Sequence, residues 1–94
     1  MTDKHMTIAE FQSYIRDRYY KTDHQRGTPG TFMWFIEEVG ELATALHNND
    51  HHNLSEEFAD VFAWLCTLAN INDINLEKAL HQKYFTNGGP IGHK

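Results

Sequence analysis

The sequence predicts an all-α fold, a small antiparallel four-helix-type bundle, and three observations support this prediction. Apolar residues recur at helical spacing in four segments, turn-forming residues separate the segments, and no convincing strand pattern occurs. The length of 94 residues suits a single domain. We therefore expect one domain over residues 1–94, with a core at about 7–87 and a mobile, Gly-rich tail at 88–94.

The first two helices are predicted from a capping pattern and a turn signal. Thr7 followed by Glu10 is the pattern of a capping box, so a helix is expected to begin at Thr7 and to end near Tyr20. The run from Gly27 to Gly30 is rich in turn formers, so a loop is expected over 21–30. A second helix is expected over 31–47. It is apolar around much of its circumference, which predicts burial in the fold or in a subunit interface.

The last two helices follow from the same spacing. A third helix is expected to begin near Asn53 or Ser55 and to reach Ile71, and a fourth to run from about Asn75 to Phe85. The apolar residues of the third helix are predicted to form a core stripe: Leu54, Phe58, Val61, Phe62, Leu65, Leu68 and Ala69. A bundle this small leaves much apolar surface uncovered, so we expect a homodimer or homotetramer.

Composition narrows the functional class. The net charge of −5 argues against binding to a nucleic-acid polymer, and the chain has no apolar run long enough to span a membrane. The single cysteine, Cys66, lies in an apolar run and excludes an internal disulfide. The start of the chain lacks the apolar core of a secretion signal. We therefore expect a cytoplasmic protein with no membrane partner.

Acidic residues are concentrated where the chain has no permanent cation. Residues 27–77 contain nine of the thirteen acids and none of the eight lysines and arginines. Carboxylates this close raise one another's pKa unless a cation lies among them. Six of the nine form two clusters, one on each middle helix: Glu37, Glu38 and Glu41, then Glu56, Glu57 and Asp60.

The geometry of the clusters favours a metal site. Residues three apart lie on one helix face, so in an antiparallel pair Glu38 and Glu41 can oppose Glu57 and Asp60. Oxygen ligands suit Mg²⁺, with Mn²⁺ or Ca²⁺ as alternatives, and protein-bound Mg²⁺ commonly shares its remaining positions with phosphates. The competing interpretation is a solvated acidic face. A ferritin-like di-iron site is disfavoured because the chain contains no Glu-x-x-His. Zinc is disfavoured because the seven histidines lack ligand geometry.

The two clusters also resemble a known signature. Glu37-Glu38-x-x-Glu41, fifteen residues, then Glu57-x-x-Asp60 is similar to the E-E-x-x-E and E-x-x-D motifs of MazG-like all-α nucleoside triphosphate pyrophosphohydrolases. The flanking residues 36–43 and 56–61 resemble the family too. So does the segment from Leu76 to Leu80 that leads to Lys83 and Asn87. The likeness covers about residues 8–87.

This resemblance implies a reaction and a set of residues. The family hydrolyses nucleoside triphosphates between the α and β phosphates, which implies Mg²⁺-dependent release of pyrophosphate from (deoxy)nucleoside triphosphates and a role in cleaning the nucleotide pool. It implies Glu38, Glu41, Glu57 and Asp60 as metal ligands. Glu37 would be an auxiliary ligand or would orient the attacking water, so the catalytic group is Glu37, Glu38 and Glu41. Lys83 and Asn87 would contact phosphate, although Gly88-Gly89-Pro90 stands where relatives often have a basic residue.

Other residues are candidates on spacing alone. Trp34 precedes Glu38 by four residues and Trp64 follows Asp60 by four, so either indole can stack on a nucleobase, with a core aromatic as the alternative interpretation. Lys83 lies on an apolar stripe, which predicts an anionic partner or a snorkelling side chain. The alternative for the whole protein is a non-enzymatic acidic helical module that binds a basic partner.

Overall fold

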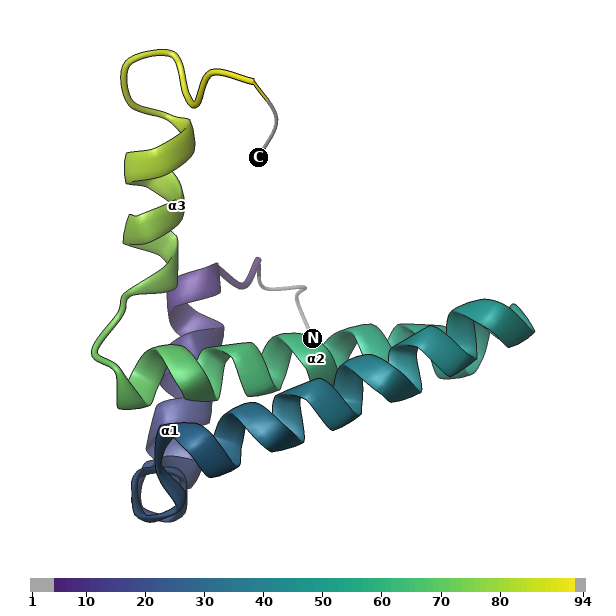
Figure 1. Ribbon diagram of the computed structural model, residues 1–94. Helices are drawn as coiled ribbons and strands as arrows, with labels where there is room; N and C mark the ends of the chain where they lie inside the picture. The colour runs from purple at the N-terminus through teal and green to yellow at the C-terminus, as the bar shows by residue number, and fades with distance from the viewer. Residues whose placement is uncertain (1–4, 93–94) are drawn as a thin grey trace.

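Three helices make up the fold, and the computed structural model describes residues 5–92 (Figure 1). They are α1 (Ile8–Asn48), α2 (His51–Ile71) and α3 (Leu76–Tyr84). No strand occurs among the described residues, so the all-α prediction is confirmed. The expected mobile tail reaches His93 and Lys94, which lie outside the described residues.

Capping side chains set the ends of the helices. The Thr7 hydroxyl accepts a hydrogen bond from the Glu10 amide at 3.0 Å, and Glu10 accepts one from the Thr7 amide at 2.8 Å. This capping box starts α1 where the sequence predicts. Asp50 caps α2 through the Asn53 amide, so α2 begins at His51 rather than at Asn53 or Ser55. Asn75 caps α3 through the Lys78 amide, which confirms the predicted fourth helix.

A kink at Gly27 replaces the predicted loop over 21–30. The helix continues past Tyr20, and within α1 only Gly27 has non-helical dihedral angles, with φ 78° and ψ 175°. Such a positive φ is accessible to glycine without a Cβ clash. Pro29 then sits in the first turn of the next helical segment, where its missing N–H removes no hydrogen bond. The prediction of a loop was wrong because one residue makes the whole turn.

The kink divides α1 into two rods that pack differently on α2. Figure 1 shows the second rod of α1 lying beside α2 and running antiparallel to it, while the first rod crosses α2 at a steep angle. α1 and α2 form most of the tertiary contacts. The antiparallel pair therefore places the acidic segments of both helices beside each other.

A buried pair of amides anchors α3. The Gln12 side chain donates to the Asn70 side chain at 2.9 Å and to the Ile74 carbonyl at 2.7 Å, and it accepts from the Leu76 amide at 2.9 Å. Gln12 and Asn70 are 8% and 4% exposed. These bonds fix the start of α3, which then extends away from the α1–α2 pair (Figure 1).

The core of a single chain is thin. Its buried apolar residues are Ile15, Ala45, Cys66 and Ala69. The predicted stripe on α2 is only partly covered, since Phe58 is 54% exposed and Leu65 is 37% exposed. Too few elements of the described residues pack against the apolar faces of α1 and α2 to cover them. No helix in residues 5–92 combines the length and the apolar content needed to cross a bilayer.

Candidate functional site

Three glutamates from two helices converge between the second rod of α1 and α2. Glu38 and Glu41 come from α1 and Glu57 from α2, and one carboxylate oxygen of each lies within 4.8 Å of the others. A cation between them would be reached by three oxygen ligands, the donor type that Mg²⁺ and Mn²⁺ prefer. Helical spacing brings the first two together, and antiparallel packing supplies the third.

Glu57 is the most informative of the three. It is only 8% exposed, and its Oε1 atom is buried without a hydrogen-bond partner. A buried carboxylate oxygen without a donor is costly, and native proteins rarely leave one. A divalent cation bound by these residues would satisfy this oxygen, so the donor set fits a hard metal ion.

The electrostatics of the cluster also favour a bound cation. Burial raises the pKa of Glu38 above its ordinary value, and the charges of Glu41, Asp60, Glu57 and Glu37 raise it further. The pKa of Glu57 is also raised, first by burial and then by Glu41, Asp60 and Glu56. All these effects disfavour the ionised form. Among residues 5–92 no cationic side chain offsets these effects on either pKa, and a bound cation would reverse both shifts.

The other predicted acids lie around Glu38, Glu41 and Glu57, which are called the acidic trio below. Asp60 is exposed and does not join the three converging oxygens, but its charge acts on both Glu38 and Glu57. Glu37 and Glu56 are also exposed. Four ligands were predicted, and the structure brings three of them together with the fourth as a charged neighbour.

The two tryptophans pack against each other beside this cluster. The rings of Trp34 and Trp64 are stacked with centroids 6.1 Å apart and an angle of 14° between planes. Trp34 is 47% exposed, so it is not a core residue of the single chain. The guanidinium of Arg26 lies over the Trp64 ring at 5.0 Å. A flat aromatic and cationic surface therefore adjoins the acids.

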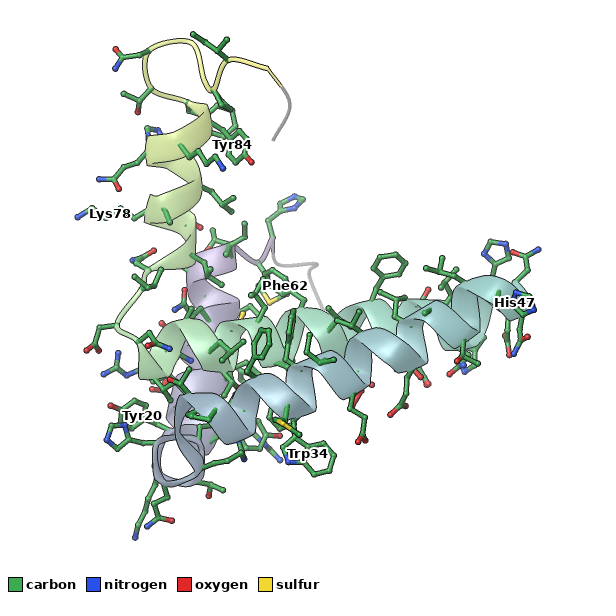
Figure 2. The ribbon with its side chains drawn as sticks, in the orientation of Figure 1. Tyr20, Trp34, His47, Phe62, Lys78 and Tyr84 are labelled. Carbon is green, nitrogen blue, oxygen red and sulfur yellow. The ribbon has the colours of Figure 1, made fainter. Side chains whose placement is uncertain are left out.

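Lys83 and Asn87 lie elsewhere. Lys83 is on α3, with its ammonium 5.4 Å from the Tyr84 ring centroid, and Asn87 follows that helix with φ 54°. Figure 2 shows Trp34 on the side of the α1–α2 pair opposite to α3 and Tyr84. Trp34 shares its helix face with Glu38, one turn later. Within one chain, therefore, α3 does not bring these two residues to the acidic trio.

Sequence reasoning missed a polar network at the kink. Asp23, which is 4% exposed, accepts hydrogen bonds from Arg26 and Thr67 at 3.2 Å each. Arg26 also donates to Thr31 at 3.2 Å across the kink. The spacing of Asp23 and Arg26, three residues apart, was the available signal. This spacing is informative only in a helix, whereas the turn-forming residues at 27–30 predict a loop for the segment.

Comparison with known proteins places these observations in a family. The family model of the MazG nucleotide pyrophosphohydrolase domain matches residues 28–84, more than half of the chain. The chain belongs to the MazG family. No curated protein matches it significantly. The matched segment contains the acidic trio, Asp60 and both tryptophans, whereas Asn87 lies beyond it.

Family membership indicates a nucleotide pyrophosphohydrolase, a class whose chemistry suits the observed donor set. Carboxylates alone repel a polyphosphate, and a divalent ion among them removes that repulsion. The acidic trio lies within the matched segment and offers the oxygen ligands that this class of chemistry requires.

The raised pKa values predict how stability depends on pH and Mg²⁺. Between the ordinary carboxyl pKa of 4.5 and the raised values, the folded chain binds more protons than the unfolded chain, so without metal the free energy of unfolding falls as the pH rises. Saturating Mg²⁺, at 100 times its Kd, should add about 2.7 kcal/mol at neutral pH. The melting temperature should then rise by about 4–8 °C for each kcal/mol gained. At pH 5 the same concentration of Mg²⁺ should raise the melting temperature far less.

Two glutamine variants make this test specific. Glu57→Gln should melt at or above the wild-type temperature without metal, because it removes a repelling charge, and it should lose most of the Mg²⁺-induced shift. Glu56→Gln is the matched control, since this neighbour is exposed and lies outside the trio. Equal Mg²⁺ shifts in the two variants, measured by calorimetric melting, would show that Glu57 does not bind the ion.

Proposed function

We propose that this MazG protein is a Mg²⁺-dependent enzyme that hydrolyses (deoxy)nucleoside triphosphates to the monophosphate and pyrophosphate, with Mn²⁺ as an alternative ion. Its role would be to remove unwanted nucleotides from the pool. The observation that supports this most is the convergence of Glu38, Glu41 and Glu57 within 4.8 Å, together with the buried Glu57 Oε1 that has no hydrogen-bond partner. The family match supplies the reaction class.

The proposed ligands are Glu38, Glu41 and Glu57, with Asp60 completing the set. Bound Mg²⁺ would neutralise phosphate oxygens and lower the pKa of a bound water. Asp60 is exposed and its charge acts on Glu38 and Glu57, so we propose that its side chain turns toward the ion when the ion binds. Attraction to the bound ion would offset the conformational freedom that the Asp60 side chain loses.

Glu37 is the proposed proton acceptor. It is exposed next to Glu38, at the rim of the cluster, where it can orient a water molecule and take its proton. The water oxygen then bonds to the α-phosphorus, and the bond from that phosphorus to the bridging oxygen breaks. Pyrophosphate leaves with the bonding electron pair, and the proton remains on Glu37 until solvent removes it.

Trp34 and Trp64 are proposed to hold the nucleobase. Their stacked rings offer an aromatic surface that is partly exposed beside the acids. A base that packs on this surface gains stacking energy without dependence on its identity. Base selectivity would then come from the polar groups around the rings.

A second copy of the chain is proposed to complete the site. Lys83 and Asn87 lie on or after α3, which extends away from the acidic trio of its own chain (Figure 2). They can contact phosphate only if α3 of one protomer reaches the trio of its partner. A homodimer or homotetramer would meet this requirement.

Exposed apolar side chains support the same assembly. Phe32, Met33 and Ile36 on α1 are 50%, 73% and 49% exposed, and Phe58 on α2 is 54% exposed. Apolar surface of this extent is unusual on a monomer and is typical of subunit interfaces. The predicted burial of the second helix would thus be achieved between chains.

The cytoplasm is the proposed location. Cys66 is fully buried, and burial raises the pKa of its thiol to about 11, so the thiol stays protonated and unreactive. A buried free thiol in a chain with no second cysteine is typical of proteins from a reducing compartment.

Activity assays test the proposed reaction. With Mg²⁺ and a panel of nucleoside triphosphates, the wild-type protein should release pyrophosphate, and Glu41→Gln and Asp60→Asn should each lower kcat at least about a hundredfold, since each removes charge that holds the ion. Glu56→Gln should stay within about twofold of wild type. Orthophosphate as the first product would indicate a phosphatase, and no turnover of any nucleotide would favour the non-enzymatic acidic module.

Light scattering tests the assembly. The apolar surface predicts particles that contain more than one chain at micromolar concentration, with a mass that is unchanged by Mg²⁺. A monodisperse monomer that releases pyrophosphate would refute both the assembly and the role of α3 from a partner chain.

A further inference from the structure

A cavity of about 360 Å³ lies between the first rod of α1 and α2, next to the acidic cluster. Asp60 lines it, so the cavity adjoins the proposed metal site. Asp23, Arg26, Trp64 and Thr67 line it as well, together with apolar side chains. Arg26 is the only lysine or arginine among the lining residues. A group that enters this cavity therefore meets one permanent positive charge.

Neighbouring side chains hold the guanidinium of Arg26 in place. Its Nη1 donates to Asp23 Oδ1 and to Thr31 Oγ1, both at 3.2 Å, and its planar group lies 5.0 Å from the centre of the Trp64 ring. Asp23 is itself fixed, because its Oδ2 accepts from the Thr67 hydroxyl. The arginine thus has lost most of its rotamer freedom before any ligand binds, so a ligand need not restrict it further.

Part of the donor set of Arg26 is unused. A guanidinium has five N–H groups, and within residues 5–92 the Nε and Nη2 atoms make no hydrogen bond. The Arg26 side chain is 24% exposed and lines the cavity. Planar N–H pairs of this kind match the spacing of phosphate oxygens and bind them in a bidentate manner.

The charge distribution indicates why such a donor is needed. Residues 27–77, which carry the acidic trio and both tryptophans, contain no lysine or arginine, so this segment offers no permanent positive charge to a polyphosphate. Arg26 stands directly before this segment and reaches back to Trp64 on α2. Among the residues that line the cavity, Arg26 is the permanent cation, and Asp60 lines the same cavity.

We propose that Arg26 contacts a non-bridging oxygen of the phosphate chain of the substrate, and that Asp23 and Thr31 are its positioning residues. This inference rests on the proposed function and extends it, because it assigns a phosphate contact within the same chain as the metal ligands. The nucleotide would then lie between the acidic trio and the kink at Gly27.

Calorimetric binding of pyrophosphate in the presence of Mg²⁺ tests this contact without requiring turnover. Loss of a charge-assisted, bidentate contact in Arg26→Gln should weaken pyrophosphate binding at least about tenfold. Arg26→Lys, which keeps the charge but loses the planar fork, should fall between wild type and Arg26→Gln. Lys21→Gln makes the same change in net charge at an exposed position of α1 and should bind as wild type does.

A second measurement separates a phosphate contact from a merely structural role. Inhibition of turnover by uncharged nucleosides should be nearly unchanged in Arg26→Lys, while KM for the triphosphate rises. Equal losses of nucleoside and pyrophosphate binding would make Arg26 a structural residue and overturn the proposal, as would wild-type pyrophosphate binding in Arg26→Gln.

The outcomes also distinguish this proposal from the proposed function. Pyrophosphate release by the wild type together with undiminished binding in the Arg26 variants would refute the contact alone. Absence of pyrophosphate release by the wild type would refute the function, and absence of pyrophosphate binding would refute the contact as well. If Arg26→Gln fails to fold, pyrophosphate binding is compared between Arg26→Lys and Lys21→Gln. Weaker binding by Arg26→Lys supports the contact, and equal binding by the two variants overturns it.

Discussion

Repulsion among carboxylates held between two packed helices is the constraint on which the account depends. Glu38, Glu41 and Glu57 approach within 4.8 Å, and burial adds to the cost of their charges. A fold that brings such groups together without a counter-charge loses stability at neutral pH. The arrangement becomes favourable when a divalent ion lies among them, and a polyphosphate can then share that ion. The proposed metal binding, the proposed substrate binding and the expected loss of stability without metal thus have one physical cause.

The kink at Gly27 determines what surrounds this centre. It turns the first rod of α1 across α2, so Asp23 meets Thr67 and Arg26 meets Trp64, although these pairs are far apart in the sequence. A continuous straight helix would carry Asp23 and Arg26 away from α2. Within the described residues no further element covers Phe32 on α1 or Phe58 on α2, and both remain half exposed.

Local features of the fold followed from the sequence, and long-range features did not. Thr7 with Glu10 and Asn75 with Lys78 form caps whose partners lie three residues apart, so the start of α1 and the limits of α3 were predictable. The convergence of acids from two helices was predicted from helical spacing and a short connection. The kink was not, because one glycine and a proline in the next first turn resemble a loop in sequence. The direction of α3 depends on Gln12 and Asn70, 58 residues apart, and no local pattern signals that pair. The placement of Lys83 was unpredictable for the same reason.

Anomalous diffraction from crystals grown with Mn²⁺ tests the shared ion most directly, since this ion takes the same oxygen ligands as Mg²⁺ and can be located by its own scattering. The account predicts a peak between the second rod of α1 and α2, in direct contact with carboxylate oxygens of both Glu41 and Glu57. Clear density for both side chains with no manganese between them, or manganese bound only to acids of a single helix, would contradict it.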